Sequence, residues 1–258
     1  MDIADREARL PLPDGFLRWF AMRGWLPRAH QLELLRKARE GHSTLLIAPT
    51  GAGKTLAGFL PTLVELSEKH LSPPAGRGRF AREASKPGEG QIALSEAAPH
   101  PTRFAPPSPR ERGEGRGLHT LYISPLKALA VDIARNLEAP IAEMELPIKV
   151  ETRTGDTPVS RRQRQRRYPP DILLTTPEQM ALLLASDDAP FLFSSLRRVV
   201  LDELHALVTS KRGDLLSLAL ARLWRLAPQM RAIGLSATVA DPESLARFLV
   251  PQPESRTA

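Results

Sequence analysis

The feature that most constrains this 258-residue chain is a short loop between an apolar run and a helical pattern. The loop consists of Ala48, Pro49, Thr50, Gly51, Ala52, Gly53, Lys54 and Thr55. Its two glycines allow the backbone to turn sharply and to direct N–H groups at an anion. The helix that begins at the end of the loop adds the positive end of its dipole. A buried strand, a glycine-containing loop and a helix in this order predict a phosphate-binding loop.

The residue types of the loop predict how it binds a nucleoside triphosphate. The ammonium group of Lys54 is expected to reach the β- and γ-phosphates, and the hydroxyl of Thr55 is expected to bind Mg²⁺. We therefore predict that the cofactors are ATP and Mg²⁺, and that all residues from Pro49 to Thr55 bind the nucleotide. The usual pattern begins with glycine, whereas Ala48 stands in that place here. The alternative is a glycine-containing turn that includes a lysine by chance.

Two adjacent carboxylates follow a second apolar run. Asp202 and Glu203 come directly after residues 199–201, and ligands of open α/β sheets bind where the strands end. Phosphoryl transfer needs a group that holds Mg²⁺, here Asp202, and one that orients and deprotonates the attacking water, here Glu203. His205 lies two residues beyond the pair, which favours a role in sensing the γ-phosphate or in contacts between domains. Taken alone, such a pair is often just the start of a helix.

Apolar runs and helical patterns alternate along most of the chain. Strands are expected at residues 44–48, 120–124, 148–152, 172–175, 198–201 and 232–235. Helices are expected at residues 28–40, 54–69, 126–139, 177–185, 215–226 and 242–249. Short, nearly continuous apolar strands that alternate with helices indicate a parallel sheet covered on both faces. The predicted fold class is therefore α/β, with a mostly parallel sheet and helices on both faces.

Two segments differ from this pattern. Residues 72–117 are rich in Pro, Gly, Arg and Glu and cannot bury enough apolar surface to offset the entropy of ordering. We predict a disordered insertion there, either without function or acting as a basic tether for nucleic acid. A dense arginine run consists of Arg161, Arg162, Arg164, Arg166 and Arg167. It is interpreted either as a solvated helix face or as a set of phosphate contacts.

Composition excludes several classes of protein. The chain has no cysteine, which excludes disulfides and thiolate metal sites. No apolar run approaches the roughly 20 residues of a membrane span, and the first ten residues lack the apolar core of a secretory signal. We therefore expect a cytoplasmic protein without a membrane partner. The formal net charge of +7 suits a polyanionic partner such as nucleic acid.

Taken together, the ordered motifs resemble superfamily 2 helicases of the DExH type. Within them the chain resembles the large-helicase-related family, and specifically the bacterial ligase-associated DExH-box DNA helicases. The resemblance implies a RecA-like ATP-binding domain at 44–250, after an N-terminal extension at 1–43 and before a tail at 251–258. It also implies that residues 24–31 form an adenine-recognition element, in which the amide of Gln31 donates to and accepts from the base. The alternative is that Gln31 is a solvated helix residue.

The same resemblance implies where nucleic acid and the coupling motif lie. The implied nucleic-acid contacts are Ser124, Pro125, Lys127, Arg153, Gly155, Thr176, Pro177 and Glu178. Ser236 and Thr238 belong to a Ser-Ala-Thr triplet that is implied to couple ATP hydrolysis to strand movement. Each short motif is weak by itself. Their order, and their shared position at the ends of predicted strands, are what favour the resemblance.

The function implied is ATP-driven translocation on DNA and its unwinding, with a link to DNA repair and a DNA ligase. An RNA helicase of the same superfamily, a non-catalytic nucleic-acid-binding fragment and a P-loop ATPase that remodels proteins are the alternatives. Helicases of this superfamily use two RecA-like domains, and no motif of the second, with its arginine fingers, follows in this sequence. We therefore expect the isolated chain to hydrolyse ATP very slowly and not to separate strands.

Overall fold

The computed structural model describes residues 12–71, 117–209 and 211–251. The predicted insertion at 72–117 lies outside the described residues except for residue 117, and the predicted tail at 251–258 except for residue 251. The beginning of the predicted N-terminal extension also lies outside them.

A six-stranded sheet forms the centre of the molecule, and all of its strand pairs are parallel. The strands are β1 (Thr44–Ile47), β2 (Thr120–Ile123), β3 (Val150–Arg153), β4 (Ile172–Thr175), β5 (Arg198–Leu201) and β6 (Arg231–Ser236). Their order across the sheet is β1-β6-β5-β2-β4-β3. The predicted α/β fold class is confirmed, and each predicted strand is found to within two residues at either end.

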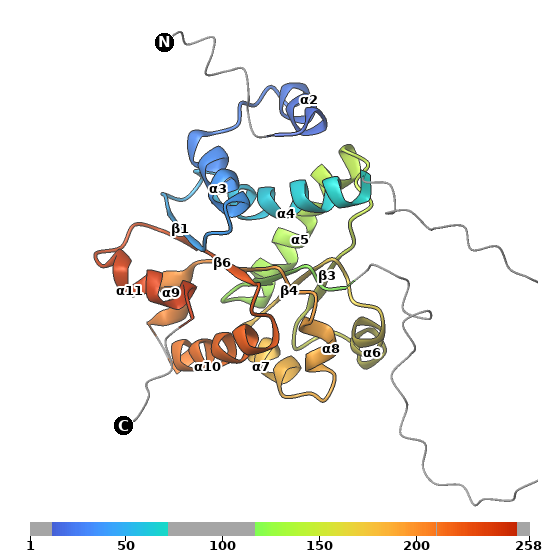
Figure 1. The fold of residues 1–258 in the computed structure, drawn as a ribbon, viewed down its shortest axis with the longest axis vertical. Helices are drawn as coiled ribbons and strands as arrows, with labels where there is room; N and C mark the ends of the chain where they lie inside the picture. Colours follow the sequence, from blue (N-terminus) through green and yellow to red (C-terminus); the bar gives the residue numbers. More distant parts are fainter. Residues whose placement is uncertain (1–11, 72–116, 210, 252–258) are drawn as a thin grey trace, which may run out of the picture.

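Helices cover both faces of the sheet (Figure 1). One face carries α2 (Asp14–Met22), α3 (Ala29–Arg39), α4 (Lys54–Leu71) and α5 (Lys127–Glu143). The other face carries α7 (Pro177–Leu184), α8 (Ala189–Phe193), α9 (Leu204–Val208), α10 (Lys211–Leu226), α11 (Pro242–Ala246) and η1 (Arg247–Leu249). The remaining helix, α6 (Val159–Arg167), follows the edge strand β3. Among the described residues, no helix is long and apolar enough to cross a membrane.

The central strands are buried on both faces, which explains their nearly continuous apolar sequences. Successive side chains of a strand point to opposite faces. Tyr122 and Val200 therefore pack in the core beneath α4 and α5, whereas Leu121 and Leu201 pack in the core beneath α7 and α10. The two cores together fix which way each residue at the end of a strand points.

Four short or atypical helices were not expected from apolar periodicity. Helix α2 buries Phe16, Trp19 and Phe20 in the same core as α4 and α5, although it lies within the predicted extension. Helix α6 consists almost wholly of Arg and Gln and has no apolar stripe, so periodicity cannot reveal it. Helices α8 and α9 are single turns. The predicted domain boundary at residue 43 stays a prediction.

One edge of the sheet collects every motif that the sequence analysis places at the end of a strand. All strands are parallel, so their carboxyl ends meet at this edge. The phosphate-binding loop follows β1, the carboxylate pair follows β5 and the Ser-Ala-Thr triplet begins at the end of β6. These three strands are neighbours in the sheet, although they are far apart in sequence. The other predicted motifs follow β2, β4 and β3, which form the other half of the sheet.

Candidate functional site

The loop after β1 has the backbone that its glycines predict. Gly51 and Gly53 have φ angles of +78° and +77°, which side-chain-bearing residues rarely adopt. A Cβ atom on Gly53 would also lie 3.0 Å from Nε2 of Gln31. The amide of Ala48 donates to the carbonyl oxygen of Ser236 at 3.1 Å, which ties the start of the loop to β6. The positive φ therefore favours glycine at position 53, and an added Cβ would in addition have to displace the amide of Gln31 slightly.

Lys54 is folded over this loop. Its side chain is 7% exposed, and Nζ donates to the carbonyl oxygens of Ala48 at 2.9 Å and Pro49 at 3.2 Å. Within the described residues, no carboxylate forms an ion pair with this ammonium group. A buried cation held by two carbonyls is poorly compensated, which makes a phosphate anion a favourable additional partner.

Asp202 is buried at the end of β5, and Glu203 turns the chain away from it. Burial raises the pKa of Asp202; the hydroxyl of Tyr122 lowers this pKa, and the carboxylate of Glu203 raises it. Oδ1 of Asp202 accepts a hydrogen bond from the amide of Glu203 at 3.0 Å. Glu203 has φ 47° and ψ 47°, a left-handed conformation that costs a non-glycine residue about 1 kcal/mol. The turn gives the two adjacent carboxylates separate positions.

His205 connects the carboxylate pair to the Ser-Ala-Thr triplet. Its Nδ1 atom lies 3.0 Å from Oγ of Ser236, 3.4 Å from the amide nitrogen of Ala237 and 3.5 Å from Oε2 of Glu203. The coupling motif and the carboxylate motif are thus in direct contact through one imidazole. Thr238, the last residue of the triplet, lies two residues after Ser236 and is exposed.

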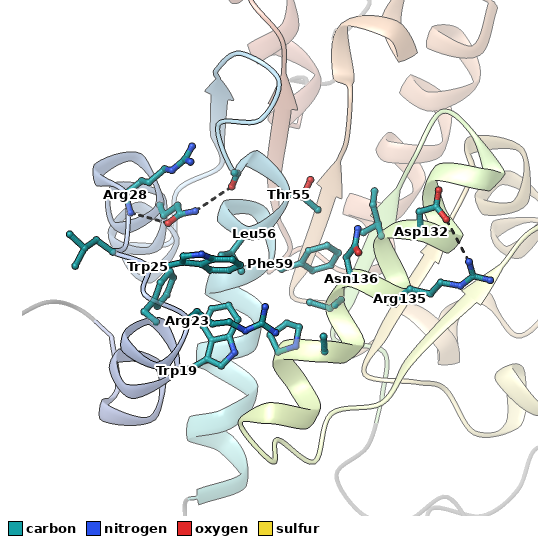
Figure 2. Close-up of a pocket in the computed structure, with 18 of the residues that line it drawn as sticks. Trp19, Arg23, Trp25, Arg28, Thr55, Leu56, Phe59, Asp132, Arg135 and Asn136 are labelled. Atoms are coloured by element: carbon teal, nitrogen blue, oxygen red, sulfur yellow. Dashed lines mark hydrogen bonds and ion pairs between the residues drawn. The ribbon is translucent and has the colours of Figure 1, made fainter.

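A groove of about 840 Å³ runs from the phosphate-binding loop along α4, between the turn that joins α2 to α3 and helix α5. Figure 2 shows Trp25 and Arg28 on one side of this groove and Asn136 on the other. Trp25 is 49% exposed, and its ring makes an edge contact with Trp19. An open groove with an aromatic wall beside a phosphate-binding loop suits a planar base.

Gln31, the residue predicted to recognise adenine, is 3% exposed and already engaged. Its Oε1 atom accepts from the amide of Arg28 at 2.9 Å, and its Nε2 atom donates to the carbonyl oxygen of Gly53 at 3.4 Å. Arg28 donates to the carbonyl oxygen of Gly51 at 3.2 Å. Gln31 therefore links the start of α3 to the phosphate-binding loop. The exposed side chains of Trp25 and Arg28, which belong to the predicted adenine-recognition element at 24–31 but were assigned no role within it, face the groove.

The predicted nucleic-acid residues divide into exposed and buried ones. Lys127 and Gly155 are exposed, and Nζ of Lys127 lies 2.7 Å from Oδ2 of Asp156. Glu178 forms an ion pair with Arg212 at 2.8 Å. The other residues are covered to a greater degree: Ser124, Thr176 and Pro177 are buried, and Pro125 is partly buried.

Arg153 differs from its prediction as a direct contact. It is 3% exposed, and its Nη1 atom donates to the carbonyl oxygen of Arg162 at 3.3 Å. Burial lowers the pKa of Arg153 to about 10, with further lowering by Arg166 and Arg162. Because α6 covers its guanidinium, Arg153 is out of reach of a strand bound at the surface. Its guanidinium instead supports the backbone of α6 through the carbonyl oxygen of Arg162.

A family model for DEAD/DEAH box helicases matches residues 28–245. The chain belongs to the DEAD/DEAH box helicase family. It is 40% identical over 90% of its length to the Lhr helicase/probable uracil glycosylase of Mycolicibacterium smegmatis, but spans 13% of that protein. It is 37% identical over 81% of its length to the ATP-dependent helicase Lhr-Core of Methanothermobacter thermautotrophicus, and spans 21% of it.

A solved structure of the Mycobacterium smegmatis helicase Lhr bound to single-stranded DNA and AMP-PNP has the same fold as this helicase domain. The TM-score is 0.70 with 35% sequence identity, over 93% of this chain and 26% of that chain. These relatives confirm the expected RecA-like fold and the large-helicase-related group. The narrower ligase-associated branch stays a prediction.

The arginine run of this helicase domain is partly structural. Arg162 donates to the carbonyl oxygens of Thr157 at 2.7 Å and Thr154 at 3.4 Å, so it shapes the loop after β3. Arg164 lies 2.8 Å from Oε1 of the buried Glu151. Arg161 and Arg166 also face carboxylates, at 3.9 Å from Oε2 of Glu151 and 3.7 Å from Oδ2 of Asp188. The guanidinium of Arg167 lies 5.6 Å from the ring centroid of Tyr168. The alternative of phosphate contacts stays a hypothesis for the run.

Proposed function

We propose that this chain is the ATP-binding motor domain of an ATP-dependent DNA helicase. The observation that carries the proposal is the sorting of motifs along one edge of the sheet. Strands β1, β6 and β5 present the phosphate-binding loop, the coupling triplet and the carboxylate pair side by side. Strands β2, β4 and β3 present the predicted nucleic-acid motifs next to them. In this proposal one edge of the sheet carries the nucleotide-binding motifs beside the nucleic-acid-binding motifs.

In this proposal the nucleotide lies along the groove and the loop. The backbone N–H groups of the loop and the ammonium group of Lys54 bind the phosphates. Trp25 offers an aromatic wall for the base, while Arg28 and Gln31 fix the position of that wall relative to the loop. The Mycobacterium smegmatis Lhr structure, which contains AMP-PNP, supports this assignment.

Thr55 and Asp202 fit a magnesium site. A hydroxyl and one carboxylate, completed by phosphate oxygens and water, form the donor set that Mg²⁺ takes beside a nucleotide. The bound ion would neutralise charge on the phosphates. In this proposal Glu203 orients and deprotonates the attacking water, and its left-handed backbone changes the direction of the chain directly after Asp202. His205, in contact with Ser236, would report the state of the γ-phosphate to the coupling triplet.

The nucleic-acid half is proposed to bind the backbone of a single strand. Lys127, Gly155 and the start of α7 at Thr176 lie at the ends of β2, β3 and β4. Contacts of this kind position a strand without reading its bases. DNA is favoured because the Mycobacterium smegmatis Lhr structure contains single-stranded DNA. A role in DNA repair and a ligase partner rest on the family resemblance alone, and a cytoplasmic location stays an expectation from composition.

Direct binding tests the proposal. We expect the chain to bind a fluorescent ATP analogue in the presence of Mg²⁺, and Lys54→Ala to weaken this binding at least tenfold. Lys37→Ala, which removes the same charge from the exposed side of α3, is the matched control and should bind as the wild type does. Equal affinity of the Lys54→Ala variant and the wild type would contradict the nucleotide site.

A second titration tests the nucleic-acid half. We expect a labelled single-stranded DNA to bind with an affinity that changes when the non-hydrolysable analogue AMP-PNP is present. Unlabelled DNA and RNA of the same sequence compete in parallel. Stronger competition by RNA would favour the RNA helicase alternative, and no binding of either would favour a protein-remodelling ATPase.

A further inference from the structure

Tyr122 carries a hydroxyl that packing does not explain. Its side chain is completely buried in the central strand β2, and its ring stacks on Phe59 of α4 with 4.6 Å between centroids and 10° between planes. Within the described residues, the hydroxyl makes no hydrogen bond of ordinary geometry. A buried hydroxyl without a partner costs free energy that a phenylalanine ring would avoid. A hydrogen-bond partner for this hydroxyl would remove that cost.

The hydroxyl lies beside the proposed metal site. Tyr122 is paired in register with Val200 of β5, and Asp202 lies two residues beyond Val200 on the same face of the sheet. Thr55 lies one helical turn before Phe59 on α4, as Figure 2 shows. Burial raises the pKa of Tyr122 well above its ordinary value, the nearby carboxylate of Asp202 raises it further and the hydroxyl of Thr55 lowers it. The same two side chains are the ones proposed to hold Mg²⁺.

We infer that Tyr122 is a positioning residue of the metal–nucleotide site, whose hydroxyl donates a hydrogen bond to the Asp202 carboxylate when a divalent cation and nucleotide are bound. This inference rests on the proposed function, which does not itself assign Tyr122. The amide of Glu203 already holds Oδ1 of Asp202 at 3.0 Å. A second donor fixes the rotation of the carboxylate and therefore the direction in which its free lone pairs face a cation.

The strand register places the two groups on the same side of the sheet, because Tyr122 pairs with Val200 and Asp202 follows two residues later. The carboxylate and the hydroxyl are already near enough to perturb each other, although their geometry is not that of a formed hydrogen bond. A cation that draws one carboxylate oxygen of Asp202 towards Thr55 would fix the position of the other oxygen. That oxygen could then accept the hydrogen bond from the Tyr122 hydroxyl. Hydrogen bonds to metal-binding side chains typically change metal affinity by about 10–100-fold.

Tyr122→Phe isolates the hydroxyl, because it keeps the stacked ring. Tyr168→Phe is the matched control, since Tyr168 is the other tyrosine of the chain and lies exposed after α6. The probes are Mn²⁺, followed by electron paramagnetic resonance in the presence of ADP, and a fluorescent ATP analogue titrated with either Mg²⁺ or EDTA. The melting temperature of each nucleotide-free variant is measured alongside.

We expect Tyr122→Phe to weaken Mn²⁺ binding about tenfold and to weaken Mg²⁺-dependent binding of the analogue to a similar degree. Binding in EDTA should stay within twofold of the wild type, and the melting temperature should be equal or higher. Tyr168→Phe should match the wild type in all measurements. This split between metal-dependent and metal-independent binding is not what a packing defect would produce.

Two results would overturn the inference. Unchanged Mn²⁺ affinity in Tyr122→Phe would show that the hydroxyl does not support the carboxylate. An equal loss of affinity in Mg²⁺ and in EDTA, with a lower melting temperature, would show a general packing role. In both cases a wild-type chain that binds the analogue, with loss in Lys54→Ala, leaves the proposed function standing. If the wild type and Lys54→Ala bind equally poorly, the proposed function fails as well.

Discussion

The imidazole of His205 lies 3.0 Å from the hydroxyl of Ser236, across the boundary between β5 and β6. His205 belongs to the carboxylate motif and Ser236 to the coupling triplet, and 31 residues separate them in the chain. The contact exists because β5 and β6 are adjacent parallel strands that end at the same edge. It gives a physical link between the proposed hydrolysis site and the segment proposed to respond to it.

A double-mutant cycle measures this link. We expect His205→Ala and Ser236→Ala each to lower the free energy of unfolding by about 1 kcal/mol, since each removes a partly buried hydrogen-bonding partner. The double variant should lose less than the sum, with a coupling of about 0.5–1 kcal/mol from urea unfolding. Additive losses would show that the contact contributes nothing beyond its two side chains.

Gly53→Ala should be strongly destabilising and should also abolish nucleotide binding. The residue has φ +77°, and the added Cβ would lie 3.0 Å from Nε2 of Gln31. We expect a loss of about 1–2 kcal/mol in the free energy of unfolding from the left-handed backbone alone. Urea unfolding and titration with the fluorescent ATP analogue check the two effects.

Gly15→Ala provides the matched control for that substitution. Gly15 lies inside α2, its φ is not in the left-handed region and nothing lies within 4 Å of an added Cβ. Alanine favours a helix interior over glycine, so stability should rise by about 0.5–1 kcal/mol. If both glycine substitutions changed the free energy of unfolding in the same direction, the backbone argument for Gly53 would be wrong.

Asp156→Asn should strengthen binding of single-stranded DNA. Asp156 holds Lys127 in an exposed ion pair with 2.7 Å between Nζ and Oδ2, and a phosphate must compete with it. Lys127→Ala should weaken binding and reduce the slope of log affinity against log salt by about 0.7, the value for one phosphate contact on a single strand. Fluorescence anisotropy across a salt series measures both, and an unchanged slope in Lys127→Ala would exclude a phosphate contact.

The lowered pKa of Glu65 predicts that this residue contributes to stability in an acid-sensitive way. Burial favours its protonated form, but His119 and Arg198 outweigh this and lower the pKa of Glu65 from 4.5 to about 2. A carboxyl whose pKa is lower in the folded state stabilises the fold above its unfolded pKa. That stability is lost as pH falls from about 4.5 towards 2. Arg198 is nearly fully buried and lies 3.0 Å from Oε2 of Glu65.

The pH dependence of unfolding in Glu65→Gln checks this. At pH 7 the variant should be less stable than the wild type, because it leaves the buried guanidinium of Arg198 without its counter-charge. The difference in the free energy of unfolding between the wild type and the variant should narrow as the pH falls from 4.5 to 2. Glu68→Gln, on the same helix but more exposed, is a suitable comparison and should show a smaller change. A constant difference across this range would contradict the low pKa.

The sequence by itself determined the fold class, the strands and the phosphate-binding loop. These depend on local properties: apolar runs of strand length, glycines that permit a left-handed turn and a lysine at the start of a helix. The carboxylate pair could be placed at a strand end for the same reason. Helix α6 escaped prediction because arginine and glutamine give no apolar period, and α2 because its three buried aromatics lie in a segment interpreted as an extension.

Tertiary structure alone decided which of these motifs meet. The strand order puts β6 between β1 and β5, so Ser236 contacts both the phosphate-binding loop and His205. Tertiary packing also buries Arg153 beneath α6 and turns the amide of Gln31 inward. It leaves Trp25 to line the groove. Such facts depend on contacts between residues far apart in the chain. They follow from the packing of whole helices and strands, which no local pattern of residues encodes.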